Sequence, residues 1–390
     1  MKFPHPLSKS RVKFSYPLWG GAIILLLLIF SVRWAKNTSS TSPHANPEKV
    51  GVVATSSFLP SKREIPPIVN VSAPSLNPAS ASIFIWKKQF LTSPVNSILA
   101  APNGIVWVAT EEGLGFIEND KLTMSTKKTG TFPAHPVTAL AHDGKALWVG
   151  TFHGLFKTID GRRFQHFTRS EGLAHEMIWS LFWDGFILWV GTQEGFSFLT
   201  PQGNFERVDK KISNGGLADL WIGAILKVNR WVICGNDDGL SIWDTSFPAA
   251  DPKAWNTIDM FQSNLIHNWI LALANFDGKV WAGTPLGLCR LDTPIDQVFS
   301  GSNPGFAVFS NRNGLPSDRV NALQSFGDSL WIGTESGLCR MRSEQIKTFG
   351  VSEGLLAKDV RAIGLASSAL WVGTSRGIQS LDPEIPSDGF

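Results

Sequence analysis

The stretch DGKALWVGTFHGLFKTIDG, residues 143–161, contains a Trp-Val-Gly-Thr run that is followed three residues later by Gly-Leu. Close copies recur down the chain, which indicates a structural unit rather than a single active site. The copies begin at seven tryptophans spaced 41, 41, 42, 50, 50 and 40 residues apart. They are Trp107, Trp148, Trp189, Trp231, Trp281, Trp331 and Trp371. The spacing is typical of a four-stranded propeller blade, and helical periodicity is missing.

One repeat predicts four strands. VTALAHDGKALWVGT, residues 137–151, alternates in polarity, turns at Asp143-Gly144 and resumes at Leu147, which predicts a hairpin with a positive-φ turn pair. Similar pairs occur at residues 103–104, 184–185 and 277–278. A third strand is expected at LFKTI (155–159) and a fourth at RFQHFT (163–168). The fold class is therefore all-β, a seven-bladed β-propeller of four-stranded blades over residues 81–390.

The repeated tryptophans are expected to be structural. In a strand Trp148 and Gly150 share one face, so each indole lies beside a position without a side chain. Neighbouring blades can interlock there, and the buried indoles would dominate the core between blades. The ring must also close. The last repeat lacks a fourth strand, whereas SIFIWKKQFLT, residues 82–92, precedes the first repeat without a partner, so we expect it to complete the seventh blade.

Two segments precede the propeller. FSYPLWGGAIILLLLIFSV, residues 14–32, is uncharged and long enough to cross a bilayer as one helix. The basic residues before it predict a cytoplasmic N-terminus, and a cleaved signal peptide is the alternative. Residues 37–80 are rich in Ser, Thr and Pro and predict a disordered linker. The expected domains are thus the cytoplasmic tip and transmembrane anchor (1–36), the linker (37–80) and the propeller (81–390).

Charge and motifs exclude several functions. The net charge of +3 comes from the N-terminal 36 residues, which hold six Lys or Arg and no acid, so the rest of the chain is no nucleic-acid binder by charge. No catalytic, metal-binding or cofactor motif is found, so no metal and no cofactor are expected. Cys234, Cys289 and Cys339 form no CxxC pair and are expected to be small buried residues.

The pattern Trp-Val/Ile-Gly-Thr-x-x-Gly-Leu/Ile, with connecting segments such as NGLPSDRVNAL (313–323) and SEGLLAKDVRAI (352–363), resembles the two-component regulator propeller repeat. The likeness covers about residues 82–390. In that family propellers are commonly extracytoplasmic sensor domains of membrane histidine kinases or hybrid regulators, and some recognise oligosaccharides. The resemblance implies a single-pass protein of a bacterial inner membrane with a periplasmic propeller. Such sensors usually carry two propellers and a kinase, whereas this chain has one propeller, so a separate signalling protein is the expected partner.

A binding site is expected at one mouth of the central channel. If the first strand of each blade is innermost, the loops before it and those between the second and third strands emerge on the same face. Aromatic rings mixed with charges suit an oligosaccharide or peptide ligand, and an ordinary solvated surface is the alternative. Trp221 and Trp269 are the sharper candidates, since the repeat does not demand a ring there. The expected ligand-binding residues are Trp179, Trp221, Trp269, Arg319, Asp359 and Arg361 at the inner strands, and Glu194, Asp237, Glu335 and Arg376 in the second set of loops.

The sequence therefore favours a membrane-anchored ligand-binding sensor or accessory module that feeds a separate two-component protein. A non-catalytic scaffold in an envelope assembly is one alternative. A propeller lyase or hydrolase is another, and it would need a cluster of histidine, acid and cation at the channel mouth. Extra residues in 244–263 and 292–310 are expected between the third and fourth strands of their blades, where they could contact a partner protein.

Overall fold

The structure is a computed structural model that describes residues 86–126, 135–366 and 369–381. The predicted membrane helix (14–32) and linker (37–80) lie outside these residues. Within the described part of the chain, no helix is long and apolar enough to cross a membrane.

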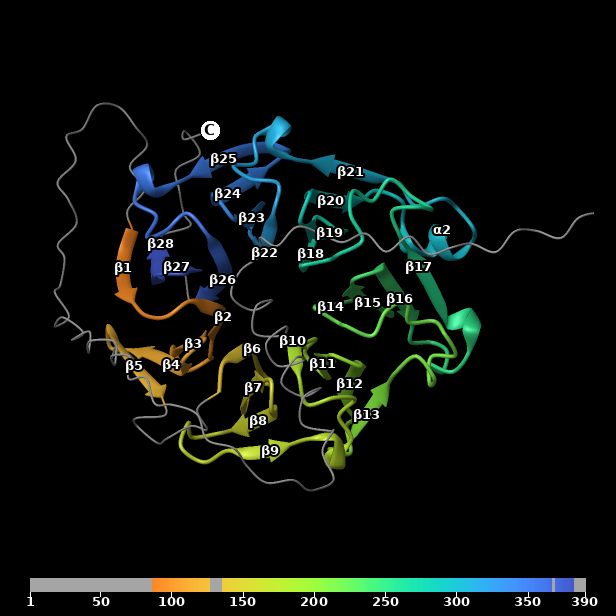
Figure 1. Cartoon of the computed structure of the whole chain (residues 1–390), viewed down its shortest axis with the longest axis horizontal. Coiled ribbons are helices and arrows are strands. Elements are labelled where there is room, and N and C mark those ends of the chain that lie inside the picture. Colours follow the sequence, from red (N-terminus) through yellow and green to blue (C-terminus); the bar gives the residue numbers. More distant parts are fainter. Residues whose placement is uncertain (1–85, 127–134, 367–368, 382–390) are drawn as a thin grey trace, which may run out of the picture. The chain divides into compact units, whose positions relative to one another are not determined.

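Seven four-stranded antiparallel sheets form the predicted propeller (Figure 1). We letter the strands of each blade a to d from the centre of the ring outward. Blade 1 consists of β2 (Val95–Ala100), β3 (Val106–Thr110), β4 (Gly113–Glu118) and β5 (Lys121–Thr126), and blade 2 of β6 (Val137–His142), β7 (Leu147–Thr151), β8 (Gly154–Thr158) and β9 (Gln165–Phe167). Blade 3 consists of β10 (Ile178–Trp183), β11 (Leu188–Thr192), β12 (Gly195–Leu199) and β13 (Phe205–Val208). Blade 4 consists of β14 (Ala224–Val228), β15 (Trp231–Asn236), β16 (Gly239–Asp244) and β17 (Trp255–Ile258). Blade 5 consists of β18 (Ala272–Phe276), β19 (Lys279–Thr284), β20 (Gly287–Leu291) and β21 (Phe306–Phe309). Blade 6 consists of β22 (Val320–Phe326), β23 (Ser329–Thr334), β24 (Gly337–Arg342) and β25 (Gln345–Phe349). Blade 7 consists of β26 (Val360–Ala366), β27 (Ala369–Thr374), β28 (Gly377–Leu381) and β1 (Trp86–Leu91).

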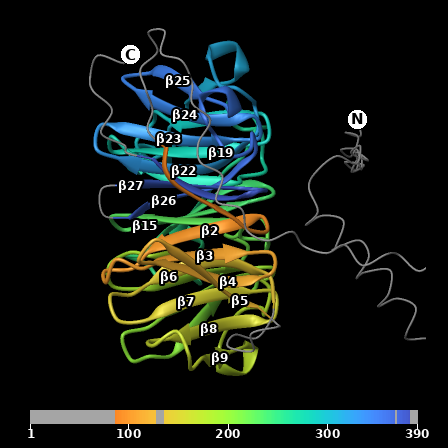
Figure 2. The ribbon, with the colours of Figure 1, turned by 90° about the vertical axis from the view of Figure 1, so that its left-hand side faces the viewer.

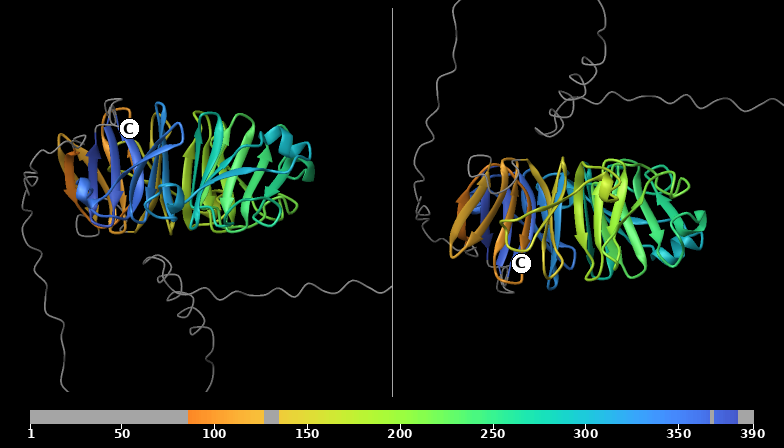
Figure 3. Two further views of the ribbon diagram at one scale, coloured as in Figure 1. Left: turned by 90° about the horizontal axis from the view of Figure 1, so that it is seen from above. Right: turned by 90° about the horizontal axis from the view of Figure 1, so that it is seen from below.

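The first strand of every blade is innermost, as expected. The seven a strands surround the centre of the ring in Figure 1, and residues from all of them line a central cavity of about 550 Å³. Seen edge-on in Figures 2 and 3, the strands run from one face of the ring to the other. The d-to-a connections and the b-to-c loops therefore share one face, which we call the upper face. The a-to-b turns and c-to-d loops share the opposite face.

The ring closes as predicted. β1 pairs antiparallel with β28, with a register running from Trp86 opposite Leu381 to Leu91 opposite Gly377. Phe90 also stacks on Trp371, with ring centroids 6.3 Å apart. The N-terminal strand thus occupies the outer position of blade 7 and covers an edge that would otherwise be unpaired.

Tryptophans and glycines of the b strands interlock neighbouring blades. Trp148 packs edge-on against Phe205 of the next blade, with centroids 6.1 Å apart. A Cβ added to Gly150 would lie 2.8 Å from Ile178, also of the next blade, so only glycine fits that approach. Six of the seven repeat tryptophans are buried, but Trp107 is only partly buried. For this first copy the expectation of full burial is wrong.

The a-to-b turns differ from the predicted positive-φ pairs. Only Asp277 and Gly278 both have positive φ, at 52° and 69°. In blades 2 and 3 only the glycine does, and the aspartate has another role. Asp143 accepts hydrogen bonds from the backbone N–H of Lys145 and Ala146 and from Trp148 Nε1 at 2.9 Å. These turns therefore tie the hairpin to the repeat tryptophan.

The remaining elements are short. The extra residues of blades 4 and 5 lie between strands c and d, as expected, and hold η2 (Pro252–Ala254) and α2 (Ile295–Phe299). The connectors between blades contain η1 (Arg169–Glu171), η3 (Asn311–Asn313) and η4 (Val351–Glu353). All three cysteines are free and buried, as predicted.

Candidate functional site

Backbone hydrogen bonds set the start of each inner strand against the preceding blade. Ile222 N–H donates to Thr192 O at 3.0 Å, and Ile270 N–H donates to Asn236 O at 3.1 Å. Each bond joins a residue shortly ahead of an a strand to the last residue of the b strand in the blade before it. The side chains that flank these isoleucines are therefore held at the boundary between two blades on the upper face.

Four aromatic rings form a continuous row across successive blades on the upper face, which we call the aromatic arc: Phe152, Trp179, Trp221 and Trp269. Successive ring centroids are 5.0, 5.0 and 5.7 Å apart, all in tilted or edge contact. Such tilted geometry is favourable for aromatic pairs. The arc crosses four blades, and the Arg319 guanidinium extends it to a fifth by lying over the Trp269 ring, 5.3 Å from its centroid.

The rings of the arc are only partly buried, unlike most repeat tryptophans. Trp179 also lines the central cavity, and its Nε1 donates to Gln193 Oε1 at 2.9 Å. Trp221 Nε1 is itself buried and finds no acceptor among the described residues. The Nε1 of the repeat tryptophan Trp331, in the core, is likewise buried without an acceptor among the described residues, so this feature does not distinguish a ligand site.

Two other predicted charges on the upper face, Arg361 and Asp359, are paired within the protein. Arg361 donates to Asn96 Oδ1 and Glu111 Oε1, both at 2.9 Å, and so links blade 7 to blade 1. Asp359 accepts from Ser375 Oγ at 2.7 Å. Two further predicted residues, Glu335 and Arg376, are exposed.

Arg319 is the cationic member of the site. Its Nε donates to Asn321 Oδ1 at 3.1 Å, which fixes the guanidinium beside the arc. Burial lowers the pKa of Arg319, and the nearby Glu335 carboxylate opposes this effect. The structure thus brings Trp179, Trp221, Trp269 and Arg319 together. Arg361 instead belongs to the blade 7–blade 1 boundary, and Asp359 bonds within blade 7.

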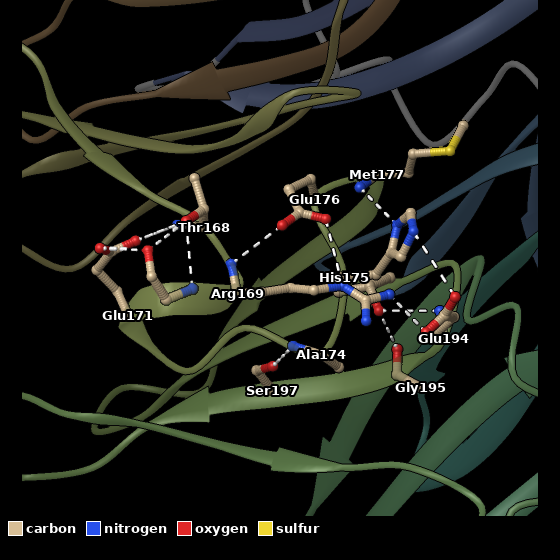
Figure 4. Close-up of polar contacts among 12 residues, drawn as sticks. Thr168, Arg169, Glu171, Ala174, His175, Glu176, Met177, Glu194, Gly195 and Ser197 are labelled. Carbon is tan, nitrogen blue, oxygen red and sulfur yellow. Dashed lines mark hydrogen bonds and ion pairs between the residues drawn. The ribbon is translucent and has the colours of Figure 1, made fainter.

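Glu194 lies in a different hollow. It forms an ion pair with Arg169, which also lies 3.3 Å from Glu176, and its Oε1 is 3.8 Å from His175 Nε2 (Figure 4). Arg169 and Glu194 line a hollow of about 320 Å³ separate from the central cavity. Burial and, after it, Arg169 lower the pKa of His175, against the opposing effects of Glu194 and Glu176. His175 is therefore neutral near pH 7.

Asp237 is exposed at the tip of the b-to-c loop of blade 4. Desolvation by the surrounding protein, followed by the charges of Asp219 and Asp238, raises its pKa to about 7. At neutral pH this carboxyl is therefore partly protonated.

Sequence reasoning missed three members of these sites, namely Phe152, Gln193 and Arg169. Phe152 and Gln193 occupy the same b-to-c loop position as Asp237, so an alignment of the repeats extended through these loops would have found them. Arg169 lies in a connector whose charges are typical of any solvated turn. In the described ranges, no group of three or more His, Cys, Asp or Glu side chains is placed to hold a metal ion.

No protein-family model and no curated protein matches the chain. Solved structures do. Residues covering 74% of this chain are similar to 40% of the extracellular domain of the hybrid two-component system BT3049 from B. thetaiotaomicron, with 19% identity and a TM-score of 0.61. A similar match, with 17% identity and a TM-score of 0.59, is to PorZ, a surface component of the type-IX secretion system of Porphyromonas gingivalis, and covers 46% of that chain.

Virginiamycin B lyase from Staphylococcus aureus is similar over 98% of its length, with 13% identity and a TM-score of 0.58. The chain spans less than half of the first two proteins and nearly all of the lyase. The propeller fold that the repeat resemblance implied is confirmed, including its likeness to an extracellular domain of a two-component system. At these identities the likeness establishes the fold alone.

Proposed function

We propose that this protein is a membrane-anchored, periplasmic ligand-binding propeller that acts as a sensor or accessory module for a separate two-component signalling protein. The ligand binds at the aromatic arc, on the upper face beside the central cavity. One observation carries the proposal. Three tryptophans that the repeat does not require, on blades 3, 4 and 5, contact one another in a row and keep their rings partly exposed.

The chemistry of the arc suits an oligosaccharide or a peptide. Partly exposed indole faces pack on the apolar faces of sugars and peptide side chains, and the Arg319 guanidinium can donate to hydroxyls or carbonyls. The likeness to the extracellular domain of a hybrid two-component system is in keeping with sensing. Anchoring by residues 14–32 would hold the propeller at the periplasmic side of the inner membrane.

A thermal-shift screen of the purified protein against oligosaccharides, peptidoglycan fragments and peptides tests the proposal. A compound that binds only the folded state raises the melting temperature. We expect Trp269→Ala to weaken binding of the hit by about fivefold to tenfold, the usual loss for one aromatic contact. Phe186→Ala, on the opposite face and 89% exposed, is the matched control and should leave affinity unchanged.

If no compound shifts the melting temperature and a protein from the envelope co-purifies instead, ligand binding is wrong and the scaffold alternative gains support. Loss of that protein on substituting the c-to-d loops of blades 4 and 5, but not the arc, would identify the contact surface.

A lyase is the second candidate, favoured by one specific cluster. Neutral His175, the Glu194 carboxylate and the Arg169 cation lie together (Figure 4), which is the combination a proton-abstracting site needs. This cluster borders the smaller hollow rather than the channel mouth. Incubation with virginiamycin B and mass spectrometry of the products tests it. Cleavage that disappears in His175→Ala would support an enzyme, and an unchanged substrate would contradict that activity.

A further inference from the structure

The smaller hollow, of about 320 Å³, lies on the upper face of blade 3 and is rich in positive charge. Four of its lining residues are cationic and two are acidic, namely Arg169, Arg207, Lys210 and Lys211, and Glu194 and Asp209. We call it the basic hollow. Its volume lies at the lower end of the range of small-molecule pockets, roughly 300 to 1,000 Å³, so it suits a small ligand or one unit of a larger ligand.

Both acids of the basic hollow are occupied by other groups of the protein. Glu194 pairs with Arg169, which also lies 3.3 Å from Glu176 (Figure 4). Asp209 Oδ1 accepts hydrogen bonds from the backbone N–H of Lys211 at 2.9 Å and of Ile212 at 2.8 Å.

The three other cations have no such partner. Among the residues that the structure describes, no carboxylate forms an ion pair with Arg207, Lys210 or Lys211. Outside the N-terminal 36 residues acidic side chains outnumber basic ones, so this excess of positive charge is local. Guanidinium and ammonium groups gathered in a hollow bind carboxylate, sulfate or phosphate groups.

Ordered backbone carries these cations. Arg207 belongs to β13, where it lies opposite Ser197 of β12. The turn that holds Lys210 and Lys211 is closed by Asp209, whose carbonyl also accepts from the N–H of Ser213 at 2.9 Å. An anionic group can therefore enter the hollow without a rearrangement of the main chain.

The basic hollow adjoins the aromatic arc at two places. Leu220 lines the hollow and directly precedes Trp221 of the arc. Glu194 lines the hollow and directly follows Gln193, whose Oε1 accepts from Trp179 Nε1 at 2.9 Å. Consecutive Cα atoms are about 3.8 Å apart, so a ligand of several units can contact both the arc and the hollow.

We infer that the ligand of the aromatic arc is an acidic oligosaccharide, with one sugar packed on Trp179 and Trp221 and the anionic group of a neighbouring sugar in the basic hollow. The inference rests on the proposed ligand-binding function and adds the chemical class of the ligand. Only Ala174 and Leu220 of the hollow's lining are apolar, which favours a hydroxylated sugar over the side chains of a peptide. The anionic group is a carboxylate, a sulfate or a phosphate.

The test uses matched probes that differ in charge. The full chain, labelled with fluorotryptophan and embedded in phosphatidylcholine nanodiscs of no net charge, is titrated while fluorine NMR shifts are followed. The sugar probes are trigalacturonate against its methyl ester, and N-acetylglucosamine carrying a sulfate or a phosphate against plain N-acetylglucosamine. The peptide pair is acetyl-Phe-Glu amide against acetyl-Phe-Gln amide. We expect at least one acidic sugar to bind about tenfold more tightly than its neutral partner, and the acidic sugar that does so identifies the anionic group.

Lys210→Ala combined with Lys211→Ala should remove most of that preference and leave the affinity for the neutral sugar unchanged. Lys145→Ala combined with Lys253→Ala is the matched control. It removes the same charge from two exposed lysines of the opposite face and should change neither affinity. The preference of the wild type should also shrink as the salt concentration rises, because salt screens exposed charges.

The inference is overturned by equal binding of acidic and neutral sugars, or by a preference that survives in the Lys210 and Lys211 variant or is lost equally in its control. A preference shown only by the acidic peptide would replace the sugar with a peptide. If the neutral sugars bind and depend on Trp269, the proposed ligand-binding function stands and only the chemical class is wrong. If neither these probes nor the screened compounds bind, the proposed function falls together with the inference.

Discussion

Trp189 contacts aromatic rings of its own blade and the next, with Phe198 at 5.3 Å and Trp243 of blade 4 at 6.3 Å between centroids. Trp189→Ala would leave a cavity between the two blades, because the sheets on either side are fixed by their own hydrogen bonds. We expect a loss of about 3 to 5 kcal/mol in the free energy of unfolding. Urea denaturation measures it. Phe186→Ala in the same blade should change stability by less than about 0.5 kcal/mol, and a Trp189→Ala melting temperature within a degree of wild type would disprove the interlock.

Asp184 satisfies three donors with two oxygens. Oδ1 accepts from the N–H groups of Phe186 and Ile187, and Oδ2 accepts from Trp189 Nε1 at 2.9 Å. In Asp184→Asn one oxygen becomes an N–H₂ donor, so one of these groups loses its acceptor, at a cost of about 1 to 3 kcal/mol. Asp277→Asn, in the equivalent turn of blade 5, should be nearly neutral, because Trp281 donates to the Phe276 carbonyl instead. A double-mutant cycle with Trp189→Phe checks the assignment, since fully additive losses would show that the two side chains are not coupled.

At the residue scale, the sequence predicts what the repeat demands and little beyond it. Burial of six repeat tryptophans follows from alternation in a strand, which depends only on local geometry. The partial burial of Trp107 does not follow, because it depends on which residues the neighbouring blade brings to that place. The raised pKa of Asp237 likewise requires Asp219 and desolvation, neither of which can be read from one loop.

Among the elements, β1 joins the two ends of the described ring. Removing residues 82–92 would expose the edge of β28 and take Phe90 away from Trp371. We expect such a chain to melt roughly 5 to 10 °C below wild type, since one or two kcal/mol shifts a domain of this size by several degrees. A chain lacking residues 40–80 is the comparison, and it should melt within about a degree of wild type. Equal melting temperatures for the two shortened chains would contradict a role of β1 in closing the ring.

The element count was predictable because each blade repeats one alternating pattern with a turn at a fixed offset. The backbone conformations of the turns were less predictable from the sequence. Asp143-Gly144 and Asp277-Gly278 are identical pairs, yet only the second has positive φ at both residues. The two hairpin loops differ in length. Phe276 pairs with Lys279 across a two-residue loop, which favours positive φ at both residues, whereas His142 pairs with Leu147 across a four-residue loop. The connection from each d strand to the next a strand was placed correctly, and this placed Trp179, Trp221 and Trp269 at one mouth.

For the molecule as a whole, Asp237 makes stability depend on pH. Its pKa in the folded protein is about 7, whereas an aspartate in the unfolded chain titrates near 3.8. Between these values the folded state holds a proton that the unfolded state lacks, so raising the pH from about 4 to 7 removes stability, and above about pH 7 the full penalty is present. Asp237→Asn cannot ionise and avoids the penalty.

The difference in free energy of unfolding between Asp237→Asn and wild type should therefore increase in favour of the variant from pH 4 to pH 8. Taking the difference cancels the titration of groups that the substitution does not touch. For Asp143 the dependence of stability on pH has the opposite direction. Partial burial raises the pKa of Asp143, but the hydrogen bonds from Ala146, Trp148 and Lys145 together outweigh burial and hold the pKa below its usual value. Stability due to Asp143 is thus present above its unfolded pKa and is lost as the pH falls through its folded pKa. A difference between Asp237→Asn and wild type that stays constant with pH would show that neither desolvation nor the charges of Asp219 and Asp238 raise the pKa of Asp237 in the folded protein.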